Sequence, residues 1–162
     1  MVNEYDVKKN VYPAPKSLAL RPNLGILPAM MKHPHLRKFE ARLHRMLAEL
    51  DDLLENRFGQ KYPLHPARAR RGSTSSKAHD GLFSTTASYT LGIGSQWGKG
   101  YVIDLHLSTL SHVPAAVQHE IRSFALARIR SLLPEHFPHR KLQADPDGTL
   151  LKIHGDLSLG EL

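Results

Sequence analysis

The stretch LFSTTASYTLGIGSQWGKGYVIDLHLS, residues 82–108, determines the fold class. From Phe83 to Ile93, the apolar and aromatic residues share one parity with Thr85, and the other parity holds Ser84, Thr86, Ser88 and Thr90. The same alternation returns from Tyr101 to Leu107. A period of two is typical of strands with one buried face, and the glycine-rich segment between the two runs predicts an antiparallel hairpin.

A helix is predicted on each side of this hairpin. Residues 35–59 repeat leucine and other apolar residues at helical spacing, with Pro34 suited to the first turn and Gly59 to the position just past the end. Residues 113–134 carry a second apolar helical face, and we expect Pro134 to end that helix. The first helix is also long enough for a coiled-coil dimer, but its wide leucine stripe favours a globular core.

A second hairpin is predicted over residues 140–160. The tetrapeptide Asp145-Pro146-Asp147-Gly148 is a strong turn signal, because proline presets one φ and glycine supplies a positive one. The order of elements is therefore α-β-β-α-β-β. The simplest packing is an α+β fold in which a four-stranded antiparallel sheet carries both helices on its apolar face and leaves the other face polar.

The beginning of the chain differs from the rest. Residues 1–34 hold five of the eleven prolines, which exclude a long helix or a central strand. They also hold more apolar side chains than a disordered tail usually has. We expect an extended, proline-rich arm over residues 1–34 that lies on its own domain or on a second subunit. A single α+β domain would follow over residues 35–162.

Composition narrows the class of protein. The chain is 41% hydrophobic and 23% charged, as expected of a globular protein. No apolar run approaches the roughly 20 residues needed to cross a bilayer, and the first residues do not resemble a secretory signal. The absence of cysteine excludes disulfides, thiolate zinc sites and cysteine nucleophiles. We expect a cytoplasmic protein without membrane insertion.

The net charge of +7 is concentrated in the first half of the chain. Residues 57–77 contain six cations and no carboxylate, and the stretch HPARARRGSTSSKAHDG, residues 65–81, adds hydroxyls and a glycine. Guanidinium groups match phosphate oxygens, so this stretch predicts an anion-binding loop, although a solvated loop could share its composition. The predicted anion-binding residues are Arg68, Arg70, Arg71, Ser73 and Lys77, with Lys61, Lys99 and Trp97 as supporting contacts.

Trp97, the only tryptophan, stands among the glycines of the first hairpin loop, close to Lys99. In that position its ring could stack on a nucleic-acid base, or it could fold back onto the core. The surrounding glycines fit neither a dinucleotide-binding fingerprint nor a P-loop.

Two Asp/His pairs provide an alternative. Asp104 and His106, and likewise His154 and Asp156, are spaced by two and fall on the expected polar sheet face. If their strands were neighbours, the four side chains could bind a divalent ion or act as an acid/base pair. The sequence lacks the H-E-x-x-H and G-x-S-x-G motifs.

We therefore expect a non-enzymatic module that binds nucleic acid or another polyanion by charge and shape, with no catalytic residue, metal or cofactor. One alternative is a metal-assisted or acid/base hydrolase that uses the Asp/His cluster. Another is a structural subunit that forms a homo-oligomer through the N-terminal arm or joins a larger complex.

Overall fold

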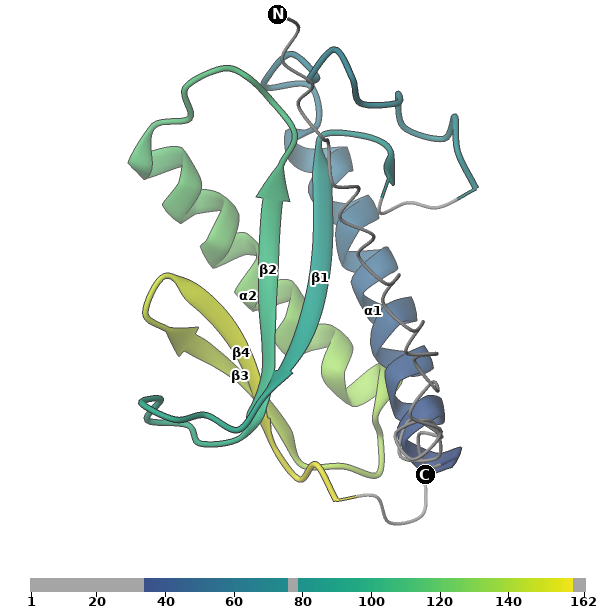
Figure 1. Ribbon diagram of the computed structural model, residues 1–162, viewed down its shortest axis with the longest axis vertical. Coiled ribbons are helices and arrows are strands. Elements are labelled where there is room, and N and C mark those ends of the chain that lie inside the picture. The colour runs from purple at the N-terminus through teal and green to yellow at the C-terminus, as the bar shows by residue number, and fades with distance from the viewer. Residues whose placement is uncertain (1–33, 76–78, 159–162) are drawn as a thin grey trace, which may run out of the picture. The chain divides into compact units, whose positions relative to one another are not determined.

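A computed structural model describes residues 34–75 and 79–158 of the chain. The predicted arm before Pro34 lies outside the described residues, and so does Lys77. The elements follow the predicted order α-β-β-α-β-β (Figure 1). They are α1 (Pro34–Phe58), β1 (Phe83–Thr90), β2 (Gly100–Leu107), α2 (Ala115–His136), β3 (Leu142–Asp147) and β4 (Leu150–Gly155).

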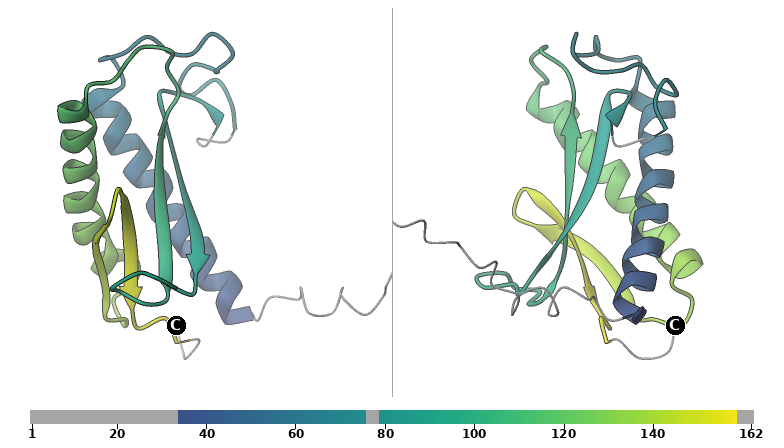
Figure 2. Two further views of the ribbon diagram at one scale, coloured as in Figure 1. Left: turned by 60° about the vertical axis from the view of Figure 1, so that its left-hand side comes forward. Right: turned by 45° about the vertical axis from the view of Figure 1, so that its right-hand side comes forward.

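The four strands form one antiparallel sheet in the order β1-β2-β4-β3. β1 and β2 pair along their whole length, from Phe83 opposite Leu107 to Thr90 opposite Gly100. β4 pairs with β2 only through residues 101–103 of β2. Both helices lie on the same side of the sheet (Figures 1 and 2). This arrangement confirms the predicted α+β fold with two helices on one face.

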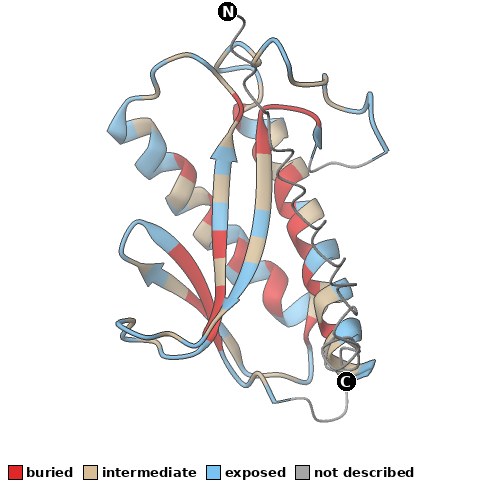
Figure 3. Ribbon diagram, in the orientation of Figure 1, coloured by how far each residue is buried: buried red, intermediate tan, exposed pale blue. Residues whose placement is uncertain are grey.

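The core lies between the helices and the apolar sheet face (Figure 3). Phe39 of α1 stacks on Tyr101 of β2 and packs against Phe137, with ring centroids 5.4 and 4.8 Å apart. At the other end of α1, Phe58 packs against Phe83 of β1. Each helix buries one apolar stripe, as its spacing predicts. Neither described helix has the length and apolarity to span a membrane.

Two predicted boundaries are wrong, and both involve proline. α2 runs through Pro134 to His136, because proline in the last turn removes only one helical hydrogen bond. The buried Phe137 holds that turn, and its amide donates to the Leu133 carbonyl at 2.8 Å. Pro146 lies within β3 instead of in the turn, which is compatible with an edge strand. The turn itself is made by residues 148 and 149.

Leu50 and Leu53 provide a test of the α1 stripe. Leu50 is fully buried, whereas Leu53 is only partly buried. We expect Leu50→Ala to lower the free energy of unfolding by about 3 kcal/mol, because it leaves a cavity in the core. Leu53→Ala should lower it by about 1 kcal/mol. Chemical denaturation measures both, and equal losses would contradict this orientation of α1.

Candidate polyanion-binding surface

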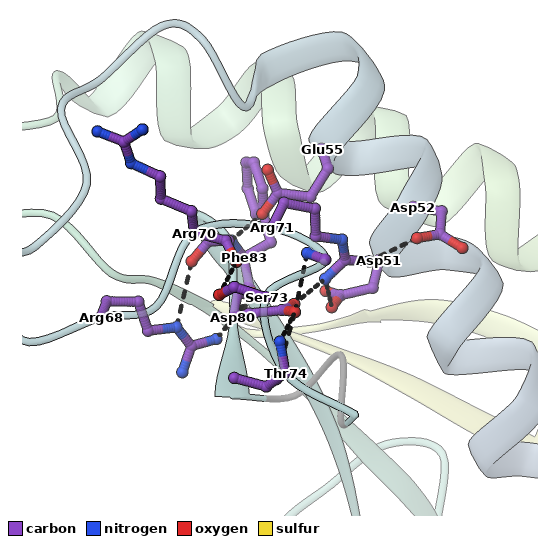
Figure 4. A network of polar contacts seen from close by, with 12 residues as sticks. Asp51, Asp52, Glu55, Arg68, Arg70, Arg71, Ser73, Thr74, Asp80 and Phe83 are labelled. Carbon is purple, nitrogen blue, oxygen red and sulfur yellow. Dashed lines mark hydrogen bonds and ion pairs between the residues drawn. The ribbon is translucent and has the colours of Figure 1, made fainter.

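The loop that the sequence predicts to bind anions is held by an ion-pair network inside the protein (Figure 4). The Arg71 guanidinium lies 2.6 Å from an Asp52 oxygen and 3.1 Å from Asp80. It also lies 3.3 Å from Asp51, whose side chain is almost completely buried. Asp51 and Asp52 come from α1, so Arg71 ties the loop to that helix. Its charge is neutralised by the protein itself.

The buried carboxylates have further partners. Thr85 of β1 donates to Asp51 at 2.7 Å, and burial raises the pKa of Asp51 above its ordinary value. Burial alone would also raise the pKa of Asp80. The backbone amides of Thr74 and Gly72, together with Arg71, outweigh that effect and hold the pKa of Asp80 below its ordinary value. Asp80 is therefore a buried anion stabilised by donors from the loop it belongs to.

Arg68 and Glu55 fix the start of β1. Arg68 donates to the backbone carbonyls of Gly81, Asp80 and Phe83 at 3.1 to 3.2 Å. The amide of Phe83 donates to a Glu55 oxygen of α1 at 2.7 Å. Burial raises the pKa of Glu55 despite this hydrogen bond. Arg68 thus links the two ends of the loop, and Arg71 links the loop to α1.

The other predicted anion-binding residues are more dispersed. Arg70 is exposed and points away from the network (Figure 4), with no side-chain partner among the described residues. Ser73 donates to the carbonyl of Arg70 at 2.6 Å. Lys61 lies 3.4 Å from Glu120 of α2, which also pairs with Arg57. Among the predicted cations that the structure describes, Arg70 and Lys99 therefore offer charges that no described side chain engages.

Trp97 neither enters the core nor stands free. Its ring stacks on His154 of β4 with centroids 4.6 Å apart, and its indole nitrogen donates to the Pro146 carbonyl at 2.9 Å. His154 in turn lies 3.0 Å from Asp145, and that hydrogen bond, followed by Arg130, holds the pKa of Asp145 below its ordinary value. The β1–β2 loop therefore lies across the outer face of the β3–β4 hairpin.

Beneath this loop, Lys152 of β4 is fully buried. Its ammonium group donates to the Ser95 hydroxyl at 2.7 Å and lies 3.3 Å from Asp147. The hydrogen bond from Ser95, followed by Lys152, holds the pKa of Asp147 below its ordinary value. The sequence places Lys152 on the polar sheet face, but it gives no sign that a loop covers it.

The register of the sheet separates the two predicted Asp/His pairs. Lys152 lies opposite Val102, so Asp104 and His154 are displaced from each other by four residues along the strands, about 13 Å. Asp156 lies beyond β4 and accepts hydrogen bonds from Ser158. No group of three or more metal-ligating side chains forms within the part of the chain that the structure describes.

Exposed cations gather instead on the first half of α1. Arg37, Lys38 and Arg45 are exposed and Arg42 is half-exposed, and none of the four has a side-chain partner among the described residues. Lys38, Arg42 and Arg45 follow one another at spacings of four and three, so they share one side of the helix. Sequence reasoning based on residues 57–77 missed this group.

The charge along α1 is strongly polarised. Residues 34–48 carry four cations and one carboxylate, whereas residues 49–58 carry four carboxylates and one cation. The helix dipole favours the opposite arrangement, so local helix stability does not explain it. The carboxylates of the second half serve Arg71, the start of β1 and, at Glu49, His136. The cations of the first half form no such ion pair with the residues that the structure describes.

A finer division of the sequence would have revealed this surface. Residues 1–48 carry nine Lys and Arg against three Asp and Glu, whereas residues 49–162 carry 13 against 12. Almost the whole excess charge of the protein therefore precedes residue 49. Half of that excess, a net charge of +3, lies in the first half of α1, which we call the cationic half-helix (residues 34–48).

Replacement of Arg71 tests whether the loop arginines are structural. Arg71→Met would leave Asp51 and Asp80 buried without their cation, and we expect a loss of about 3 kcal/mol in the free energy of unfolding. Arg70→Met, the matched control, should change it by no more than about 0.5 kcal/mol. Denaturation at several pH values measures both.

The same experiment has a pH signature. Without Arg71 the buried carboxyls bind protons more tightly in the folded state. In folded Arg71→Met these carboxyls are therefore protonated at a higher pH than in the folded wild type. The difference in free energy of unfolding between wild type and Arg71→Met should therefore shrink as the pH falls from neutral to about 4. A deficit that is constant or grows over this range would contradict the assignment.

The domain that carries this surface matches a protein family. The family model, described as "Uncharacterised protein", matches residues 34–155, from the beginning of α1 to the end of β4. An uncharacterized protein from Borreliella burgdorferi is similar, with 36% identity over 118 residues that cover 73% of this chain and 92% of that protein. No solved structure matches. The chain therefore belongs to this family through the domain that α1 begins and β4 ends.

Proposed function

We propose that the protein binds nucleic acid by charge and shape, and that the cationic half-helix is its principal phosphate-binding surface. The observation that supports the proposal is that some cations are paired within the protein whereas others are not. Arg68, Arg71 and Lys61 are engaged by protein groups. Lys38, Arg42 and Arg45 form a row of cations that no described protein group neutralises.

The geometry of this row suits a polyanion. From Lys38 to Arg45 the helix rises about 10 Å, so the three side chains can reach successive phosphates along one strand. Arginine provides planar donor forks for phosphate oxygens, and lysine provides a point charge. Such contacts give affinity and orientation without reading sequence.

Other cations at the same end of the domain extend the surface. Lys141 precedes β3 and Lys99 lies in the β1–β2 loop, and both are exposed without a side-chain partner among the described residues. In both views of Figure 2, as in Figure 1, the beginning of α1, the beginning of β3 and the β1–β2 loop lie at one end of the domain. Positive charge gathered at one end raises the local concentration of an anionic polymer and its association rate.

The test is a titration of single-stranded and duplex oligonucleotides at several salt concentrations. Wild-type protein should bind, and its log affinity should fall linearly with log salt, by about 0.9 for each phosphate that it neutralises on a duplex. The double variant Lys38→Gln/Arg45→Gln should flatten that slope by about 2 and weaken binding to all sequences alike.

The matched control is Arg57→Gln/Lys61→Gln. It removes the same formal charge, but both cations already share Glu120. We expect this control to keep most of the affinity and a salt slope close to that of wild type. Absence of binding at low salt, or an equal effect of both double variants, would refute the cationic half-helix as the binding surface.

A further inference from the structure

The tip of the β1–β2 loop exposes apolar side chains that the proposed phosphate contacts do not use. Ile93 is 93% exposed and Leu91 is 71% exposed, and Tyr89 at the base of the loop is half-exposed. Turn positions are usually occupied by Gly, Pro, Asn, Asp or Ser. A single exposed leucine is ordinary, but two large aliphatic side chains at one tip indicate a contact surface.

Contacts with the sheet hold the loop in a conformation that leaves these side chains exposed. Trp97 stacks on His154, and Ser95 accepts a hydrogen bond from the buried Lys152, so one limb of the loop is fastened to the sheet. The two limbs also touch: a Cβ at Gly92 would lie 1.8 Å from the Gly98 carbonyl oxygen, and Gly92 has a φ of +77°. Leu91 and Ile93 thus stand on a loop that is held by contacts with the sheet and between its own limbs.

The charges around the tip indicate what it contacts. Residues 91–99 contain no carboxylate, and Lys99, the one cation among them, is exposed. The carboxylates beneath the loop are occupied, Asp145 by His154 and Arg130 and Asp147 by Lys152. The tip therefore combines apolar side chains with an uncompensated positive charge, at the end of the domain that holds the cationic half-helix (Figure 2).

We propose that Ile93, flanked by Leu91, is an apolar wedge that inserts between the bases of a nucleic acid; this inference rests on the proposed function. Aliphatic side chains act in this way in proteins that bend or unstack nucleic acid, and the major groove admits a two-stranded ribbon. Phosphates bound by the half-helix and Lys99 would hold the strand in place while the bases cover the tip. An anionic bilayer shares the charge, but two aliphatic side chains anchor a protein to a membrane only weakly.

The experiment uses the full chain with a DNA duplex and a single strand that each contain 2-aminopurine, whose fluorescence rises when it unstacks. Binding is followed separately by anisotropy. At saturation, wild type should raise the fluorescence. Ile93→Ser should abolish most of that rise and weaken binding about tenfold, with an unchanged salt slope.

Leu110→Ser is the matched control, because Leu110 is 74% exposed but lies in the loop between β2 and α2. It should behave as wild type in both measurements. Lys38→Gln/Arg45→Gln should weaken binding yet keep the fluorescence rise at saturation, which separates the wedge from the phosphate contacts.

Four outcomes would overturn the wedge. If wild type binds without a fluorescence rise, or Ile93→Ser equals wild type, the wedge fails while the proposed function stands. If neither oligonucleotide is bound at low salt, the proposed function fails as well. If phosphatidylserine vesicles are bound in an Ile93-dependent manner while base stacking is undisturbed, the tip is a membrane contact instead.

Discussion

The pairing of Arg71 with three carboxylates is the interaction on which the charge distribution of this domain depends. A guanidinium with five donors can serve several carboxylates at once, and only such an arrangement makes the burial of Asp51 and Asp80 tolerable. Because Asp51 and Asp52 belong to α1, the pairing also fixes the loop before β1 against the second half of that helix. Arg71 thereby neutralises Asp51 and Asp52, whereas the cations of the first half have no such partner among the described residues. A helix whose charges balance over its whole length in sequence therefore presents mainly its cations at the surface once folded.

A second constraint acts on the opposite face of the sheet. An uncovered outer face would leave Lys152 and His154 in solvent, but the β1–β2 loop lies across them and supplies Ser95 and Trp97 as partners. A fully buried ammonium group is unfavourable unless it is paired and hydrogen-bonded, and both conditions are met here. A glycine-rich loop would otherwise sample many conformations, but these contacts fix one of its limbs to the sheet. Its apolar tip is therefore held away from the domain. The polar side chains of Lys152 and His154 therefore determine where the exposed side chains of the β1–β2 loop lie.

The sequence predicted the fold well, because its periodicities are local and strong. The alternation around Tyr101 and the leucine stripe of α1 each determine which side chains are buried, and together they leave one simple packing. The errors at Pro134 and Pro146 arose because a proline rule is a local preference, which a buried side chain or an edge position overrides. No pattern in the sequence indicated the order of the strands in the sheet. The short pairing of β4 with β2 at residues 101–103 follows from tertiary packing, and that register is what separates Asp104 from His154.

The site was harder to predict, because the net charge of a sequence window says nothing about neighbours brought by folding. Residues 57–77 lack carboxylates, yet Asp51, Asp52 and Asp80 flank that window and reach into it. The same reasoning explains why the first half of α1 is the better candidate: its preceding residues are themselves basic. The acidic residues 49–58 that follow it are engaged by Arg71, the start of β1 and His136. Cations that oppose a helix dipole, and that lack partners within residues 34–75 and 79–158, carry an electrostatic cost in that part of the protein. An anionic polymer would remove that cost on binding, which makes the unfavourable arrangement of α1 an argument for a ligand and not merely for solubility.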